Sequence, residues 1–346
     1  MSLTQRLGIE LPLLQAPMAG VQGSALAVAV SEGGGLGALP CAMLSPQAMS
    51  DELERIRGQT SRPLNVNFFC HLPPEPDPAR DARWHQALAP YYAELGLDID
   101  SVASGAGRRP FDHQACDVLE VFRPEVVSFH FGLPSSALLE RVKAWGATVL
   151  SSATTVEEAL WLEANGADAV IAQGLEAGGH RGMFLTQDLT TQVGTLALLP
   201  QVKEAVSVPV IAAGGITDAR GVAAALALGA DAVQVGTAFL CCPEATTSSL
   251  HRRALQSEAA RHTALTNLYS GRPARGIVTR LMRELGPISS VAPAFPLATA
   301  AIGPLRSAAE ALGSSDFSPL WAGQNASGCR NVPAAELLRE LVREIS

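Results

Sequence analysis

Aromatic and charged residues are both scarce in this sequence of 346 residues, at 5% and 17%, whereas hydrophobic residues make up 47%. This balance excludes a disordered chain and predicts a large core of Ala, Val and Leu. There is no block of Lys or Arg and the net charge is −8, which argues against nucleic acid as a partner. No apolar run approaches the roughly 18 residues of a membrane span, and residues 1–6 lack the apolar centre of a signal peptide. We therefore expect a cytoplasmic protein that does not enter a membrane.

Clusters of metal-binding residues are also missing. The six cysteines show no C-x-x-C spacing, which is typical of reduced cytosolic thiols. Glu176 and His180 are four residues apart, but the glycines between them disfavour the helix that would align them as ligands. We expect no metal site. Five histidines without ligand spacing are assigned to structural or surface roles: His71, His85, His113, His251 and His262.

Short apolar segments alternate with helical segments along most of the chain. Eight strands are expected, at 13–20, 36–39, 64–69, 126–131, 148–151, 167–172, 208–213 and 232–237. The helices expected between them include 24–31, one opening at Ser45-Pro46, 134–145, 155–166 and 218–228. Alternating βα units imply a parallel sheet, and eight of them suggest closure into a barrel. We therefore predict an α/β fold, a (β/α)8 TIM barrel, over residues 1–244.

Two segments depart from this repeat. Residues 71–113 follow the third strand, contain four prolines between 73 and 78 and a Gly105-Ala-Gly107 turn, and are expected to form a functional insertion. Residues 245–346 exceed one closing helix. They are expected to form a small helical subdomain with helices at 275–285 and 334–345 around a Pro-rich segment, completing the barrel and covering its catalytic end.

Polar side chains gather at the carboxyl ends of the expected strands. Alternation along the fourth strand points His130 into the barrel near its C-terminal end. Asn67 on the third strand and Gln173 after the sixth are expected near the same end. His180 follows in the Gly-rich stretch 173–182. Active sites of this fold lie at that rim, so the four are expected to converge. The alternatives are polar caps on the barrel interior and, for 173–182, a mobile turn with an incidental histidine.

Glycine turns after the seventh and eighth strands, Gly214-Gly215 and 234–237, are expected to bind phosphate through backbone N–H groups. The alternative is that tight βα turns simply require glycine. A Rossmann dinucleotide site is not supported, because the Gly-rich stretch 33–37 follows a helix and precedes a strand.

Six motifs give this chain a resemblance to a known family. They are QAPMAG (15–20), NVNFFCH (65–71), VSFHFGLP (127–134), AQGLEAGGHRG (172–182), AAGGI (212–216) and QVGTAFL (234–240). In order and spacing the chain resembles class I of the nitronate monooxygenases, formerly called 2-nitropropane dioxygenases, which are FMN-dependent TIM barrels. The EAGGH loop is similar to that of flavin-dependent enoyl-acyl-carrier-protein reductases, whereas SFHFG separates the two groups.

The resemblance implies site residues. His180 would be the catalytic base, and His130 would line the substrate pocket as a second donor to the nitro group. The implied FMN contacts are Ala16, Pro17, Met18, Asn67, Gln173, Gly178, Gly179, Gly214, Gly215, Gln234, Val235, Gly236 and Thr237. Tyr269, Phe295 and Trp321 are candidates for the aromatic pocket wall, with Phe295 where the family would have Tyr.

The resemblance also implies an activity. Alkyl nitronates such as propionate 3-nitronate, or nitroalkanes, would be oxidised by O2 to a carbonyl compound and nitrite via a flavin semiquinone, a detoxifying reaction of a monomer or homodimer. A histidine with a reference pKa of about 6.5 suits removal of the α proton near neutral pH. One alternative is an NAD(P)H-dependent flavin reductase acting on quinones or enoyl thioesters. Another is a non-catalytic FMN-binding barrel.

Overall fold

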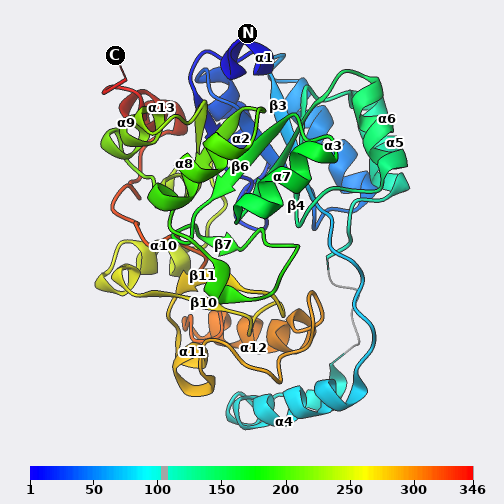
Figure 1. The fold of residues 1–346 in the computed structure, drawn as a ribbon. Coiled ribbons are helices and arrows are strands. Elements are labelled where there is room, and N and C mark those ends of the chain that lie inside the picture. Colours follow the sequence, from blue (N-terminus) through cyan, green and yellow to red (C-terminus); the bar gives the residue numbers. More distant parts are fainter. Residues whose placement is uncertain (103–107, 346) are drawn as a thin grey trace.

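The computed structural model describes residues 1–102 and 108–345 (Figure 1). The Gly105-Ala-Gly107 turn of the expected insertion lies outside the described residues. Eight parallel strands form one sheet in the order β1-β9-β8-β6-β5-β4-β3-β2. Their bounds are β1 Leu13–Gln15, β2 Gly37–Pro40, β3 Leu64–Phe69, β4 Val126–His130, β5 Thr148–Ala153, β6 Ala169–Gln173, β8 Val210–Ala213 and β9 Ala232–Val235.

The sheet closes on itself between β1 and β2. A parallel bridge joins Leu14 to Leu36, and the Gln15 amide donates to the Leu36 carbonyl at 2.9 Å. The predicted (β/α)8 barrel is therefore confirmed. The first strand ends at Gln15 rather than at residue 20, because Pro17 has no N–H to continue the ladder.

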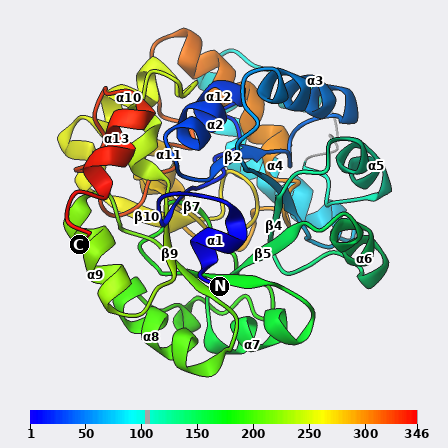
Figure 2. The same cartoon turned by 90° about the horizontal axis from the view of Figure 1, so that it is seen from above.

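Helices surround the strands as a ring (Figure 2). In chain order the ring consists of α2 Ser24–Glu32, α3 Pro46–Arg57, α5 His113–Phe122, α6 Ser136–Ala144, α7 Val156–Ala164, α8 Thr195–Ala205, α9 Ala219–Ala227 and α13 Ala334–Leu341. Local signals start several of them: the Ser45 side chain accepts from the Ala48 amide, and Thr155 and Asp218 cap α7 and α9 in the same way. The last helix, α13, packs between α2 and α9 and so closes the ring.

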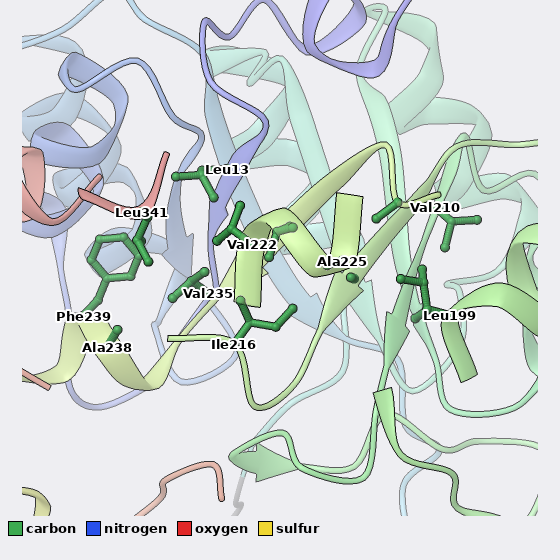
Figure 3. Packing of buried hydrophobic residues seen from close by; sticks show 14 of the residues in the cluster. Leu13, Leu199, Val210, Ile216, Val222, Ala225, Val235, Ala238, Phe239 and Leu341 are labelled. Carbon is green, nitrogen blue, oxygen red and sulfur yellow. The ribbon is translucent and has the colours of Figure 1, made fainter. Parts of the chain in front are cut away.

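The main core lies between the strands and this ring (Figure 3). Leu13 and Val235 from the strands meet Val222 from α9 and Leu341 from α13 in one buried cluster. Each such aliphatic side chain contributes about 1.5–3 kcal/mol on burial. The short helix α1 Leu3–Leu7 belongs to a second cluster, which includes Leu36 and Ile171.

Residues after β9 add a layer over the carboxyl ends of the barrel strands. It contains η3 Thr237–Cys241, α10 Ser249–Leu255, η4 Glu258–Arg261, β10 Thr263–Thr266, β11 Ala274–Ile277, α11 Arg280–Leu285 and α12 Thr299–Ala311. The helix expected over 275–285 begins only at Arg280. Residues Ala274–Ile277 instead form a strand between β10 and the two-residue strand β7 Gly179–His180. The predicted C-terminal helical subdomain therefore also contains two strands, which form a three-stranded sheet with β7 because β11 pairs on both sides.

The insertion after β3 carries helix α4 Pro78–Glu94 and a short turn, η1 Ile99–Ser101. This helix lies against α12, away from the barrel helices (Figure 1). Trp84 and Leu88 share one buried cluster with Leu281 and Ile302, and the Tyr92 hydroxyl donates to the Ala301 carbonyl at 2.6 Å. The insertion is thus anchored on the C-terminal layer.

No helix within 1–102 and 108–345 is both long and apolar enough to cross a membrane.

Candidate active site

One large cavity lies at the carboxyl ends of the barrel strands, under the C-terminal layer, with about 1280 Å³ of empty space including its mouth. Most of the residues predicted for the site line it together: Ala16, Pro17, Met18, Asn67, His130, Gln173, Gly178, Gly179, His180, Gly214, Gly215, Gln234, Gly236, Thr237 and Trp321. These residues come from segments far apart in the sequence. Parallel strands bring them together because all their carboxyl ends meet at one rim.

Three predicted residues lie behind this lining. Val235 packs in the barrel core, because alternation along β9 points its side chain away from that of Gln234. The Tyr269 hydroxyl bonds to Thr279, and its ring packs in the cluster beneath α4 and α12. The Phe295 ring joins a cluster with Phe69 and Phe131, 5.4 Å from the His180 ring by centroids.

The backbone of His180 is held from several directions. Residues Gly179 and His180 pair with Arg275 and Ala274 of β11. The His180 carbonyl accepts from Gln173 Nε2 at 3.0 Å and lies 3.1 Å from His130 Nε2. Gln173 Oε1 accepts in turn from the Gly182 amide at 2.7 Å. Gln173 and His130 therefore act together on the loop that carries His180.

A fully buried arginine fastens the same loop to the barrel. Arg181 donates from Nη2 to the Gln173 carbonyl at 2.7 Å, from Nη1 to the Gly174 carbonyl at 2.6 Å and from Nε to Gln192 Oε1 at 2.9 Å. Sequence reasoning missed this residue. The sequence feature that could have identified Arg181 is a charged residue inside a Gly-rich loop directly after a buried strand.

The His180 ring lies among aromatic rings. The ring centroids of Trp321, Phe69 and Phe131 are 5.6, 6.0 and 6.1 Å away, and Nε2 is 2.8 Å from the hydroxyl of Ser270. Burial is the largest cause that holds the pKa of His180 well below its usual range, followed by the nearby positive charge of Arg108. At neutral pH the imidazole is therefore uncharged, and one of its ring nitrogens carries a lone pair.

Both ring nitrogens of His130, the other histidine at the rim, are occupied by hydrogen bonds. His130 Nε2 faces the His180 carbonyl, which can only accept, so Nε2 carries the proton. Nδ1 is 3.1 Å from Ser152 Oγ and accepts from that hydroxyl. Burial lowers the pKa of His130 to about 4, which keeps this ring neutral as well.

Two guanidinium groups that sequence reasoning did not identify lie near His180. Arg272 stacks over the Phe131 ring, with Cζ 4.0 Å from the centroid, and donates to the Met183 carbonyl at 2.8 Å. Arg108 lines the cavity. Within the described part of the chain neither forms an ion pair with a carboxylate. Burial lowers the pKa of Arg272 only to about 10, so it stays charged and the cavity favours an anion.

Part of the cavity lining, the glycine end, is built from glycine turns. Gly179 and Gly215 have φ of +71° and Gly214 +124°, a region that residues with a Cβ rarely adopt. A Cβ on Gly178 would lie 2.5 Å from the Gly323 nitrogen. Residues 322–325 cross above these turns, and the Gly323 amide donates to Thr237 Oγ1 at 3.0 Å.

Two buried oxygens in the cavity lining lack partners. Gln234 Oε1 and Thr217 Oγ1 form no hydrogen bond with any described residue. Unpartnered buried polar atoms are rare, and both residues line the cavity, so their side chains have hydrogen-bonding capacity left for a polar ligand. Among the described residues no group of three or more His, Cys, Asp or Glu side chains is arranged to hold a metal.

The fold and the site together define a class of protein: a barrel enzyme with a small-molecule site formed at its rim by strand ends, glycine turns and a neutral imidazole. The sequence profile described as nitronate monooxygenase matches residues 1–344, and the chain belongs to this family of enzymes.

Known relatives cover nearly the whole chain. A nitronate monooxygenase of Pseudomonas aeruginosa is 45% identical over 99% of this chain and 98% of its own length. One from Paraburkholderia phytofirmans is 42% identical over 99% of this chain and 94% of its own. Among solved structures, nitroalkane oxidase from Streptomyces ansochromogenes superposes with a TM-score of 0.91, at 42% identity, covering 100% of this chain and 98% of that one. FabK from Thermotoga maritima superposes at 0.71, with 27% identity, over 99% of this chain and 96% of that one.

Proposed function

We propose that this protein is an FMN-dependent enzyme that uses O2 to oxidise alkyl nitronates, and nitroalkanes after removing their α proton, to a carbonyl compound and nitrite. The single observation that carries this proposal is a buried neutral imidazole, that of His180, close to guanidinium groups without carboxylate partners. Such a site suits an acid that becomes an anion when it loses its proton.

The residues at the glycine end fit FMN. A flavin and its ribityl chain present N–H and O–H donors, which Gln234 Oε1 and Thr217 Oγ1 lack. The turns at Gly178-Gly179 and Gly214-Gly215 line the cavity, and at Gly179 the space that a Cβ would occupy is open, so backbone N–H groups there can approach a phosphate. We propose that these turns and residues 236–237 hold the phosphate. Ala16, Pro17, Met18 and Asn67 would flank the ring. When bound, FMN supplies the electron acceptor that links the substrate to O2.

His180 performs the proton transfer in this proposal. A nitroalkane α proton is acidic because the nitro group accepts the electron pair of the broken C–H bond. The neutral imidazole takes that proton, a contribution of about 10²–10⁴-fold for a positioned base. The aromatic rings around His180 exclude water, which strengthens the electrostatic interactions inside the cavity.

The guanidinium groups favour the anionic form of the substrate. Arg272 and Arg108 stay protonated at neutral pH and would stabilise negative charge as it develops on the nitro oxygens. Arg108, which lines the cavity, would also bind a preformed nitronate directly. His130 was expected to donate to the nitro group. Because its Nε2–H already donates to the His180 carbonyl, we propose that it shapes the pocket and fixes the loop.

Anaerobic stopped-flow spectroscopy tests the proposal. We expect propionate 3-nitronate to reduce the bound flavin rapidly, and NADH or NADPH to do so slowly or not at all. Rapid reduction by NADH or NADPH without reduction by nitronate would favour the flavin-reductase alternative. Bound flavin that none of these compounds reduces would favour a non-catalytic role. Removal of nitronates in the cytoplasm would be detoxification, and this physiological role belongs to the proposal.

A further inference from the structure

The side chain of His180 has one polar partner in the described structure. The backbone of this residue is fixed by β11, Gln173 and His130, but none of these contacts reaches its ring. The ring could still turn about its side-chain bonds. Apart from packing against the surrounding aromatic rings, the polar contact that opposes this rotation is the hydrogen bond between Nε2 and Ser270 Oγ, at 2.8 Å.

Ser270 is itself held rigidly. It is 1% exposed and lies in the turn between β10 and β11, where the Gly271 amide donates to the Asn267 carbonyl at 2.8 Å. Gly271 has φ of +92°, and a Cβ there would lie 2.2 Å from the Pro293 carbonyl oxygen. The backbone therefore sets the place of the Ser270 hydroxyl.

We propose that Ser270 is the positioning residue of His180, which orients the ring and determines which of its nitrogens carries the proton. This inference rests on the proposed function only in the role it gives His180. Ser270 has no contact with substrate in the proposal and acts through the imidazole.

We assign the direction of this hydrogen bond from the second neighbour of the hydroxyl. The Ser270 hydroxyl has one hydrogen and a second neighbour, the Arg272 carbonyl at 3.4 Å, which can only accept. If the hydroxyl donates to Arg272, its oxygen accepts from Nε2–H of His180, and both groups are satisfied. Nδ1 of His180 is then the nitrogen with a free lone pair. The opposite arrangement would place the proton on Nδ1 and leave His180 unable to act as a base there.

The remaining nitrogen is available to a substrate. His180 lines the cavity, Nδ1 bonds to no described residue, and it is not among the unpartnered atoms sealed inside the protein. When Nδ1 takes the α proton, the C–H electron pair moves onto the nitro group. The resulting imidazolium keeps its Nε2–H bond to Ser270. The charged or titratable groups that act on this ring are Arg108, His130, Arg272 and His71.

Nitrogen NMR of the histidine-labelled full-length flavoprotein tests the assignment without any turnover. The His180 signals are identified by their loss in His180→Gln. In the wild type we expect Nε2 protonated and Nδ1 unprotonated at pH 7. In Ser270→Ala we expect a mixture of the two forms, and in Ser270→Thr, which keeps a hydroxyl, the wild-type pattern. Ser318→Ala is the matched control, because it removes a buried hydroxyl bonded to Glu310 in the C-terminal layer.

Kinetics provide the second readout. We expect Ser270→Ala to lower kcat/KM for nitroethane by about 10- to 100-fold, while the value for preformed ethyl nitronate changes by less than about threefold. Ser270→Thr should recover most of the loss, and Ser318→Ala should leave both values unchanged. Equal losses with both substrates, or an unchanged His180 tautomer in Ser270→Ala, would overturn the proposal. If the wild type oxidises neither substrate, the proposed function fails, and the NMR result still decides the role of Ser270.

Discussion

Replacing Arg181 with methionine tests whether this residue fastens the His180 loop. Its guanidinium makes three hydrogen bonds of 2.6, 2.7 and 2.9 Å while fully buried. Hydrogen bonds to charged groups contribute about 1.5–3 kcal/mol each, so their sum is about 4.5–9 kcal/mol. The net loss is smaller because burying the charge costs free energy, which also lowers the pKa of Arg181 to about 10, and because methionine fills part of the space. We expect the free energy of unfolding to fall by about 3–5 kcal/mol.

Thermal unfolding followed by circular dichroism measures this loss. For a chain of this size each kcal/mol lowers Tm by about 2 °C, so Arg181→Met should unfold roughly 6–10 °C earlier. Arg306→Met is the matched control. It removes a partly exposed ion pair with Glu310 on α12, for which we expect less than about 1 kcal/mol. Equal Tm values for the two variants would refute the interpretation of Arg181 as a structural clamp.

Three further predictions concern the chemistry and the pH dependence. His180→Gln should lower kcat/KM for a nitroalkane by about 10²-fold or more but leave preformed nitronate as a substrate; parallel losses in the steady-state rates would contradict its role as base. Arg272→Gln should raise KM for propionate 3-nitronate about tenfold, measured by nitrite release, with a smaller effect on the neutral nitroalkane; an equal effect on both would show that its charge is not used. Unfolding scans should show Tm falling between pH 6.5 and 4, because buried histidines with a lowered pKa stay neutral in the folded state while the unfolded chain takes up protons. Each contributes up to about 3 kcal/mol above pH 6.5, which is lost as the pH falls. The pKa values are about 4 for the three residues concerned, His71, His130 and His251, and a Tm that is constant over this range would refute the prediction.

Local signals in the sequence were sufficient to predict the barrel. The start of α3 at Ser45-Pro46 depends on a few neighbouring residues, and so do the caps of α7 and α9. The alternation that turned His130 toward the cavity is also local. All strands of a parallel barrel end at a common rim. Each strand can be identified from its own local pattern, and this is enough to predict which residues meet at the rim.

The C-terminal layer could not be predicted in the same way. Residues 275–279 are compatible with a helix, yet Ala274–Ile277 became a strand because β10 and β7 lie on either side of it. Tyr269 is a candidate for the pocket wall in the sequence analysis. In the structure its hydroxyl is hydrogen-bonded to Thr279, and its ring packs in the cluster beneath α4. Both outcomes depend on neighbours far away along the chain.

Strand periodicity, helix caps and turn residues act over a few positions, so the closed parallel barrel and a rim carrying His180 and its glycine turns could be predicted from the sequence. The surroundings of that histidine could not, because they depend on three-dimensional packing. Ser270, Arg272 and Arg108 come from segments outside the βα repeat, and the packing of the insertion and the C-terminal layer brings them close to His180. Long-range packing has no period in the sequence, so these contacts became visible only in three dimensions.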